Sequence, residues 1–307
     1  MKTLVIGGTG HIGKFLVPQL CRQGCETTVV SRGQTGPGQG KPWDHVPMEK
    51  AQYKRHDQQW HQFIAATGAE VIIDILGIDV PGTYEAAKAS CRHYVACGSL
   101  WMYGPARIVP TPEATQGPCE FESYAMRYDE LQATMKLAHQ DGIAFTAIMP
   151  PNICGPGKIP IEGAGGRDIE VHRAHAQGKP TILPEGCNTL VSPCDADDVA
   201  QGFALAVAER DQAAGEIFNV GPAYGLTTPE LIETYSQIYQ TRIPVEQVGW
   251  NKFLSEVLPE PGANYHFRHH MAPDISKIRQ TLGYRPKYTS AESMGRAVEW
   301  MRGKGLI

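Results

Sequence analysis

Short apolar runs alternate with segments of helical periodicity through the first half of the chain. The apolar runs have the length and composition of strands that are buried on both faces. The predicted strands are Lys2–Ile6, Thr27–Val30, Val71–Leu76, His93–Cys97 and Ala144–Met149. The predicted helices between them are Lys14–Arg22, Gln59–Thr67, Thr83–Ser90 and Tyr124–Gln140. This β-α-β alternation predicts an α/β fold with a doubly wound parallel sheet.

The pattern becomes less regular beyond Pro150, where prolines and glycines interrupt the chain. Further helices are predicted at about 168–177, 196–209, 229–239 and 291–302. We therefore expect a sheet domain at residues 1–150 and a smaller, partly interleaved lobe at residues 151–307. Two short extended stretches, Gln52–Arg55 and Glu216–Val220, would extend the sheet.

A glycine-rich turn follows the first predicted strand. It consists of Gly7, Gly8, Thr9, Gly10, His11, Ile12 and Gly13. A strand, such a turn and a helix together present backbone N–H groups at a helix N-terminus to a pyrophosphate. Gly7 permits the tight turn, Gly10 the approach of the phosphates, and Gly13 the packing of the helix on the strand. A triphosphate-binding loop is disfavoured, because Phe15 stands where Ser or Thr must hold magnesium. We predict a dinucleotide site, and a turn with purely structural glycines is the alternative.

The end of the second predicted strand bears on the choice of dinucleotide. Proteins that bind NAD place an acidic residue there, to accept hydrogen bonds from the ribose 2′-hydroxyl. Here the strand ends in Ser31-Arg32-Gly33 and has no carboxylate. Because Ser31 and Arg32 could bind a 2′-phosphate, we expect NADP(H) to be preferred, with NAD(H) possible. Asp57 follows the third strand and is expected to meet the adenine amino group. The Gly- and Pro-rich segment 33–50 is expected to be a surface loop near the adenosine.

Composition and charge narrow the class of protein. The chain has 307 residues, of which 42% are hydrophobic and 20% charged, as in ordinary globular proteins. Its net charge of -4 gives no electrostatic reason to expect nucleic acid or an anionic membrane as a partner. No apolar run approaches the roughly 20 residues that span a bilayer. The glycine turn also interrupts the first apolar stretch, so we expect no signal peptide and a cytoplasmic location.

Cysteine and histidine are numerous but do not form metal-binding patterns. The eight cysteines include no C-x-x-C pair, which favours reduced, buried thiols. His172 and His175 are three residues apart, and His269 and His270 are adjacent, but neither pair has an acidic residue at ligand spacing. We expect no metal. His269 or His270 could instead serve as an acid–base group.

Five motifs stand in order along the chain: Gly7–Gly13, Gly98–Gly104, Pro151–Gly157, Phe218–Gly221 and Asp274–Pro286. Together they resemble the extended, atypical short-chain dehydrogenases/reductases of the NAD(P)-dependent sugar epimerase/dehydratase superfamily. The resemblance covers nearly the whole chain. It implies a Rossmann-type sheet with a small C-terminal lobe that binds the substrate.

The catalytic set of that family is a Ser or Thr, a Tyr, and a Lys four residues after the Tyr. By motif, Ser99 corresponds to the hydroxyl residue and Tyr124 to the tyrosine. Tyr128 stands where the lysine belongs, and Lys136 lies about 18 Å from Tyr124 along the helix, too far to act. Arg127 lies on a neighbouring part of the same helix face and could supply a fixed positive charge. It could not exchange a proton as lysine does.

The resemblance also implies which residues surround the two ligands. Beyond the glycine turn and the second strand, the expected cofactor contacts are Leu76, Gly77, Tyr124, Pro151, Asn152 and Ile153. The expected substrate contacts are Trp101, Cys154, Arg167 and Arg268. The two arginines are candidates for binding a phosphate or a carboxylate.

Three interpretations of function remain. We favour an oxidoreductase or epimerase that acts at a hydroxyl or carbonyl carbon of a sugar, sugar nucleotide or similar polar metabolite. Its catalytic residues would form an altered proton relay, in which Tyr124 or Tyr128 works beside Ser99 and Arg127. The alternatives are a catalytically degenerate NADP(H)-binding regulatory or redox-sensing protein, and a relic pocket. Beyond a small-molecule substrate, a homodimer is expected through the helix that carries Tyr124. Its apolar candidates are Leu131, Met135 and Ala138.

Overall fold

The centre of the protein is a seven-stranded sheet in which every neighbouring pair of strands runs parallel. The computed structural model describes residues 1–33 and 43–307. The strands in sheet order are β11 (Glu216–Asn219), β6 (Ala144–Met149), β5 (His93–Cys97), β4 (Val71–Asp74), β1 (Lys2–Ile6), β2 (Glu26–Ser31) and β3 (Met48–Lys50). The strand order reverses between β1 and β4, and ligands bind at the carboxyl edge beside such a reversal. The predicted doubly wound α/β fold is confirmed.

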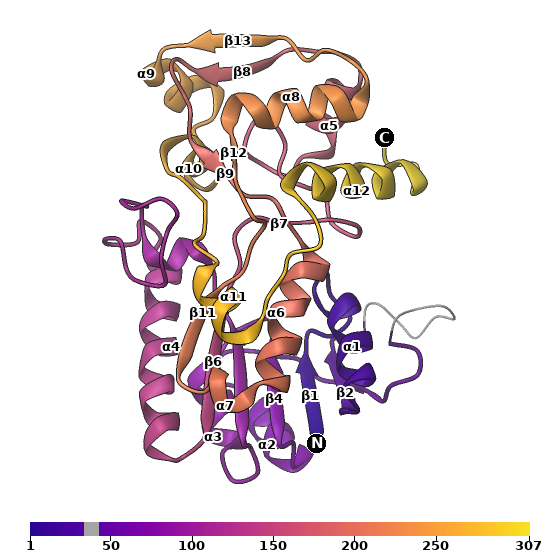
Figure 1. The fold of residues 1–307 in the computed structure, drawn as a ribbon, viewed down its shortest axis with the longest axis vertical. Coiled ribbons are helices and arrows are strands. Elements are labelled where there is room, and N and C mark those ends of the chain that lie inside the picture. Colours follow the sequence, from indigo (N-terminus) through magenta and orange to yellow (C-terminus); the bar gives the residue numbers. More distant parts are fainter. Residues whose placement is uncertain (34–42) are drawn as a thin grey trace.

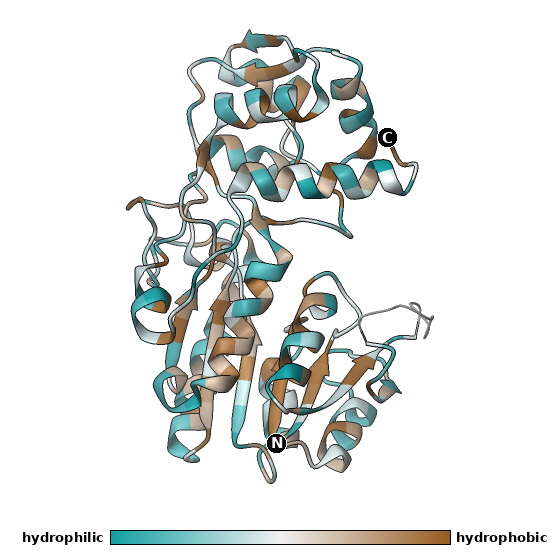
Figure 2. Cartoon of the chain, turned by 45° about the vertical axis from the view of Figure 1, so that its right-hand side comes forward, coloured by the Kyte–Doolittle hydropathy of each residue, from teal (hydrophilic) through white to brown (hydrophobic). Residues whose placement is uncertain are grey.

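Helices cover both faces of this sheet, because its strands are apolar on both sides. One layer consists of α1 (Gly13–Arg22), α6 (Ala196–Ala208) and α11 (Ser276–Leu282). The other consists of α2 (Gln58–Thr67), α3 (Val80–Ala87) and α4 (Glu122–Gln140). Successive residues of β4 serve different layers: Ile73 packs in one core and Ile72 in the other. Figure 2 shows the apolar residues concentrated in these strands.

A smaller lobe lies over the carboxyl ends of the strands (Figure 1). Its elements are β7 (Ile153–Cys154), α5 (Ile169–Ala176), β8 (Thr181–Pro184), β9 (Leu190–Val191), β12 (Leu226–Thr227), α8 (Thr228–Tyr239), β13 (Val245–Val248), α9 (Trp250–Lys252), a π-helical turn at Phe253–Val257, α10 (Pro261–Arg268) and α12 (Ser290–Gly303). Its own core includes Tyr235, Phe253 and Val298. Between these elements the chain returns to the sheet, through β10 (Cys194–Asp195), α6, α7 (Arg210–Ala213) and β11. The lobe therefore interleaves with the sheet domain and is not a separate block.

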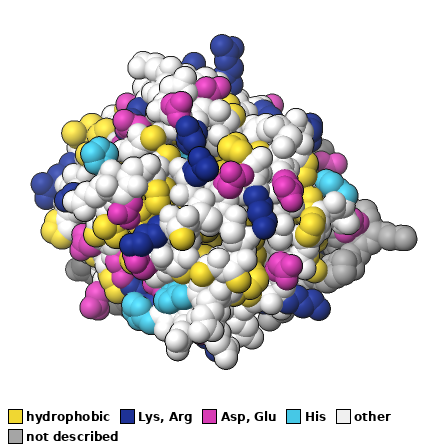
Figure 3. Space-filling model, turned by 90° about the horizontal axis from the view of Figure 1, so that it is seen from below, with side chains coloured by type: hydrophobic (Ala, Val, Ile, Leu, Met, Phe, Trp, Pro, Cys, Tyr) yellow, Lys and Arg dark blue, Asp and Glu magenta, His cyan; other side chains and the backbone are white. Residues whose placement is uncertain are grey.

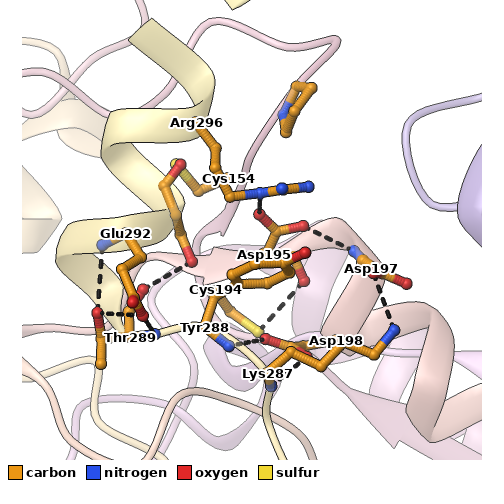
Figure 4. A network of polar contacts seen from close by, with 12 residues as sticks. Cys154, Cys194, Asp195, Asp197, Asp198, Lys287, Tyr288, Thr289, Glu292 and Arg296 are labelled. Carbon is orange, nitrogen blue, oxygen red and sulfur yellow. Dashed lines mark hydrogen bonds and ion pairs between the residues drawn. The ribbon is translucent and has the colours of Figure 1, made fainter. Parts of the chain in front are cut away.

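A polar network joins the lobe to the sheet domain where α12 meets the start of α6 (Figure 4). Arg296 of α12 donates to the carboxylate of Asp195 at 2.9 Å, and Asp195 is 0% exposed. Asp195 also caps α6 by accepting from the Asp197 N–H at 2.9 Å. Asp198 accepts from the backbone N–H of Lys287 at 2.7 Å. Because this network is buried, it fixes the position of α12 relative to the sheet.

One expectation about local structure is wrong. The third strand is β3, Met48–Lys50, and Gln52–Arg55 is not a strand. Residues 34–42 of the expected surface loop lie outside the described residues. On α4, Leu131 and Ala138 are buried in the core beside the sheet, and Met135 packs against the same core. Leu131 and Ala138 are therefore covered by the protein's own core, whereas Met135 is half-buried, and the homodimer stays a prediction.

Neither the charged surface shown in Figure 3 nor the cysteines of the described residues form a distinctive feature. Basic and acidic side chains are interspersed over the face at the amino ends of the strands (Figure 3). None of the helices in the described parts of the chain is long and apolar enough to cross a membrane. Within residues 1–33 and 43–307, no cluster of His, Cys, Asp or Glu could hold a metal ion. All eight cysteines are free.

Candidate active site

The glycine-rich turn connects β1 to α1 at the carboxyl edge of the sheet. Gly7 has a φ of +83°, a conformation that residues with side chains rarely adopt. The Gly10 N–H donates to the carbonyl of Gly7 at 2.9 Å. A Cβ on Gly13 would lie 2.2 Å from the carbonyl oxygen of Gly8. The helix therefore approaches the turn so closely that only glycine fits, which is the cradle that a pyrophosphate requires.

A cavity of about 550 Å³ opens beside this turn. It is lined by Ile6, Gly7, Thr9, Gly10, Val30, Ser31, Arg32, Ala51, Tyr53, Trp60, Leu76 and Ile78. The rings of Tyr53 and Trp60 stack at 4.3 Å. Leu76 and Ile78 are 43% and 37% exposed, although they are large and apolar. A planar base that entered the cavity would cover these side chains, so the cavity suits an adenosine group.

Two aspartates near this cavity have structural partners. Asp57 is absent from the residues that line it, and its carboxylate caps α2 by accepting from the Gln59 N–H at 2.9 Å. The structure therefore gives Asp57 a capping role, and its expected contact with adenine stays a prediction. Asp74 is fully buried and accepts from the Tyr53 hydroxyl at 2.7 Å and from the Gly77 N–H at 2.8 Å. It fixes the loop after β4, where the cofactor contacts were expected.

A second cavity, of about 430 Å³, lies between the sheet domain and the lobe. Predicted site residues that line it are Ile12, Ser99, Trp101, Tyr124, Arg127, Pro151, Asn152, Ile153 and Arg167. They come from the glycine turn, from the segment after β5, from α4 and from the segment after β6. The structure thus brings together residues that are far apart in the sequence but lie at adjacent strand ends.

Ser99 and Tyr124 both face this second cavity. The Ser99 hydroxyl accepts from the Trp101 N–H at 3.3 Å, which begins a 3₁₀ turn at Leu100–Tyr103. The Tyr124 ring lies 5.4 Å from the ring of Trp101. Burial raises the pKa of Tyr124 above 10, and the charge of Arg127 opposes that shift. The phenol is therefore protonated near neutral pH and can act as a proton donor.

The two residues at the site of the absent lysine lie differently. Tyr128 is not among the residues that line the cavity; its hydroxyl accepts from the Gln132 side chain at 2.9 Å, and its ring packs on Tyr103 at 5.7 Å. Arg127 lines the cavity and donates to the Leu76 carbonyl at 3.0 Å. Arg127, and not Tyr128, therefore brings a charge to the site.

The lobe contributes two cations to the second cavity. Arg167 donates to the carbonyls of Ile159 at 2.7 Å and Ile153 at 2.9 Å. Burial lowers the pKa of Arg167. Lys158 also lines the cavity, and its pKa is lowered by burial and by Arg167. Among the described residues, neither cation has a carboxylate in an ion pair.

The remaining substrate candidates lie elsewhere. Arg268 forms an ion pair with Glu120 at 2.7 Å and is absent from the cavity lining. Cys154 is 1% exposed and donates to the Ser293 carbonyl, so it cannot meet a substrate. Burial raises the pKa of Cys154 to about 12, which makes its thiol inert. His269 is held by the same Glu120, at 2.8 Å.

His266 is a site residue that the sequence did not reveal. It lines the second cavity, is 6% exposed, and lies 5.2 Å from the ring of Trp101. Burial lowers its pKa to about 3, so the imidazole is neutral. Asn152 contacts its Nδ1 at 3.5 Å. The helix α10 that carries it has only eight residues and is not among the helices predicted from the sequence, where the adjacent pair His269-His270 gave the stronger signal.

Comparison with known proteins agrees with this geometry. The family model described as "NAD dependent epimerase/dehydratase family" matches residues 3–86 and 83–221. The chain belongs to this family. Its members are NAD(P)-dependent oxidoreductases and epimerases, and the protein is an enzyme of this type. The matched residues include the glycine turn, Ser99, Tyr124 and the segment after β6.

Individual relatives are distant but extend over the whole chain. The chain is 24% identical to the chloroplast stem-loop binding protein of 41 kDa b of Arabidopsis thaliana, over 100% of this chain and 80% of that protein. It is 22% identical to dTDP-6-deoxy-L-talose 4-dehydrogenase (NAD(P)(+)) of Kitasatospora kifunensis, over 95% of this chain and 93% of that protein. Among solved structures, UDP-glucose-4-epimerase of Stenotrophomonas maltophila, with bound NAD and formylated UDP-arabinopyranose, has a TM-score of 0.74 and 16% identity. That alignment covers 99% of each chain.

Proposed function

We propose that this enzyme uses NADP(H) to oxidise, reduce or epimerise a hydroxyl-bearing carbon of a sugar, sugar nucleotide or similar metabolite that carries an anionic group. The observation that carries the proposal is the second cavity. Its lining includes the hydroxyl-bearing Ser99 and Tyr124 together with the cationic Arg167 and Lys158. Its one carboxylate, Glu260, is already occupied with capping α10. A polar substrate with negative charge would match this lining.

The cofactor would be held by backbone at the glycine turn and by side chains at the end of β2. Gly7 to Gly13 would surround the pyrophosphate, because the close approach of Gly13 to Gly8 leaves the turn without obstructing side chains. Ser31 and Arg32 would take the 2′-phosphate. Leu76 and Gly77 would lie along the cofactor, as would the segment 151–153. When bound, the nicotinamide would supply or accept the hydride.

Tyr124 would hold the proton that the reaction moves. In the reductive direction its phenol donates to the carbonyl oxygen of the substrate, and the Ser99 hydroxyl donates to the same oxygen. The pKa of Tyr124 is raised by burial, so the proton is present at neutral pH. The nearby guanidinium of Arg127 stabilises the phenolate that forms. Because arginine stays charged, the phenolate must regain its proton from water or from another side chain.

The substrate's anionic group would meet Arg167 and Lys158. The two carbonyls that hold Arg167 fix its guanidinium without neutralising its charge. A phosphate or carboxylate would offset the positive charge of these cations; the pKa of Lys158 is lowered first by burial and then by the charge of Arg167. Neutral His266 would add an uncharged polar group to the same wall.

The test compares two tyrosines on one helix. Tyr124→Phe should bind NADPH as wild type does, measured by fluorescence titration, but should lose turnover about 100-fold or more against a panel of carbonyl-bearing sugar nucleotides. Tyr128→Phe is the matched control, because its hydroxyl lies outside the cavity lining. It should keep both binding and turnover. Retained turnover in Tyr124→Phe would refute the assignment of the proton donor.

The name of the Arabidopsis relative suggests an RNA-binding alternative. The net charge of -4 and the mixed charges on the face in Figure 3 argue against binding of nucleic acid. They favour an enzyme without this second function. A gel-shift titration with a stem-loop RNA tests this. Tight, salt-dependent binding would contradict our prediction that nucleic acid is not a partner.

A further inference from the structure

A second cationic residue, Lys50, lies on the strand next to the end of β2, where Ser31 and Arg32 line the first cavity, although Lys50 is not itself among the lining residues. β2 and β3 are parallel neighbours, and their register pairs Ser31 with Lys50. Paired residues on neighbouring strands lie about 5 Å apart. Lys50 is the last residue of β3, so it ends at the same sheet edge as Ser31 and Arg32. The register therefore places Lys50 next to the pair expected to bind the 2′-phosphate.

The side chain of Lys50 passes close to Gly33, the residue that follows that pair. Gly33 has a φ of +73°, and a Cβ on it would lie 3.0 Å from Cε and 3.1 Å from Cδ of Lys50. The long aliphatic part of Lys50 therefore crosses Gly33, one residue after Arg32. In the same turn the Gly33 N–H donates to the Ser31 hydroxyl at 3.1 Å. Any side chain at Gly33 would push Lys50 away from this turn.

Neither cation has an acidic partner. Among the described residues, no ion pair or hydrogen bond to a carboxylate involves Arg32 or Lys50. The adjacent Glu49 projects to the opposite side, because successive residues of a strand alternate. It lines a different cavity, together with Lys2 and Phe63. The local charge is therefore uncompensated, and an anion that bound there would relieve the repulsion.

We propose that Lys50 is a specificity-determining residue, which binds the 2′-phosphate of NADP(H) together with Arg32. The proposal rests on the preference for NADP(H) proposed above and adds a residue to it. A 2′-phosphate carries close to two negative charges at neutral pH, so two cations match it better than one. The 2′-hydroxyl of NAD(H) offers no charge and would gain little from either.

The experiment isolates the phosphate with two fragments that differ only in that group. Binding of 2′,5′-ADP and of 5′-AMP is measured by calorimetry for wild type, Lys50→Met, Lys50→Arg and Arg32→Met. Lys136→Met, on the exposed face of α4, controls for the loss of one charge far from the site. Thermal unfolding checks that each variant is folded.

Wild type should bind 2′,5′-ADP more tightly than 5′-AMP. Lys50→Met should weaken 2′,5′-ADP about tenfold, the size of one charged hydrogen bond, and leave 5′-AMP within about twofold. Lys50→Arg and Lys136→Met should resemble wild type. If Arg32→Met loses discrimination but Lys50→Met does not, the role of Lys50 is refuted while the cofactor preference stands. If wild type does not discriminate between the fragments, the preference for NADP(H) fails, and the role of Lys50 with it.

Discussion

Alanine at Gly13 would test the close approach on which the cofactor site depends. Its Cβ would lie 2.2 Å from the carbonyl oxygen and 2.3 Å from the carbonyl carbon of Gly8. Carbon atoms in contact are about 3.5 Å apart, so the turn and α1 must separate by roughly 1 Å. Such overpacking costs roughly 1–3 kcal/mol of stability. Backbone donors displaced by this distance no longer reach a pyrophosphate, because hydrogen bonds weaken steeply beyond about 3.2 Å.

Gly13→Ala should therefore lose NADPH affinity by about 10- to 100-fold, the loss of one or two charged hydrogen bonds. Fluorescence titration measures the affinity, and thermal unfolding should show a midpoint lower by several degrees, about 2–4 °C for each kcal/mol. Gly295→Ala is the matched control. It lies inside α12 with nothing within 4 Å of the added Cβ, and should raise stability by about 0.5–1 kcal/mol. Unchanged NADPH affinity in Gly13→Ala would refute the cradle.

Two further predictions concern stability. The pKa values of His172 and His175 are lowered by burial from 6.5 to about 4, so the unfolded chain binds protons first. Stability should be full above pH 6.5 and fall as the pH drops toward 4; a melting temperature that is constant between pH 7 and 5 would contradict this. Asp195→Asn should destabilise the protein by about 1–3 kcal/mol, because buried Asp195 is the partner of Arg296. Asp211→Asn, in an exposed pair, should change stability by less than about 0.5 kcal/mol in the same denaturation assay.

The sheet was predictable because its signal is local and strong. Each buried strand is an apolar run, and β1, β5 and β6 begin and end at the predicted residues. The error at β3 has a physical cause. β3 is a three-residue strand at the sheet edge, and Glu49 and Lys50 are exposed, so no apolar run marks it. Its position is set by pairing with β2, which a single sequence does not encode locally.

The predicted site residues also divide into those that belong to local motifs and those that were chosen only by their place in the chain. The glycine turn, Ser99 and Tyr124 belong to local motifs, and the structure brings them to the cavities as the motifs suggested. Arg268 and Cys154 were chosen by their place in the chain, and tertiary contacts gave both of them other partners. Asp57 likewise caps its own helix, α2. A residue's type and position do not reveal which competing partner it will meet on folding.

In our proposal, Tyr128 stands where the family's catalytic lysine belongs, and the positive charge has another source. The ring of half-buried Tyr128 packs on Tyr103, which is itself buried in the core. The positive charge then comes from Arg127, one residue earlier, whose approach requires Gly77: a Cβ there would lie 2.8 Å from the Arg127 Nη2. Gly77, Leu76 and Arg127 thus form one unit between the loop after β4 and α4. Because that unit carries a fixed charge and no exchangeable proton, Tyr124 is left as the proton donor in our proposal, and its reprotonation becomes the step that the ordinary lysine would have served.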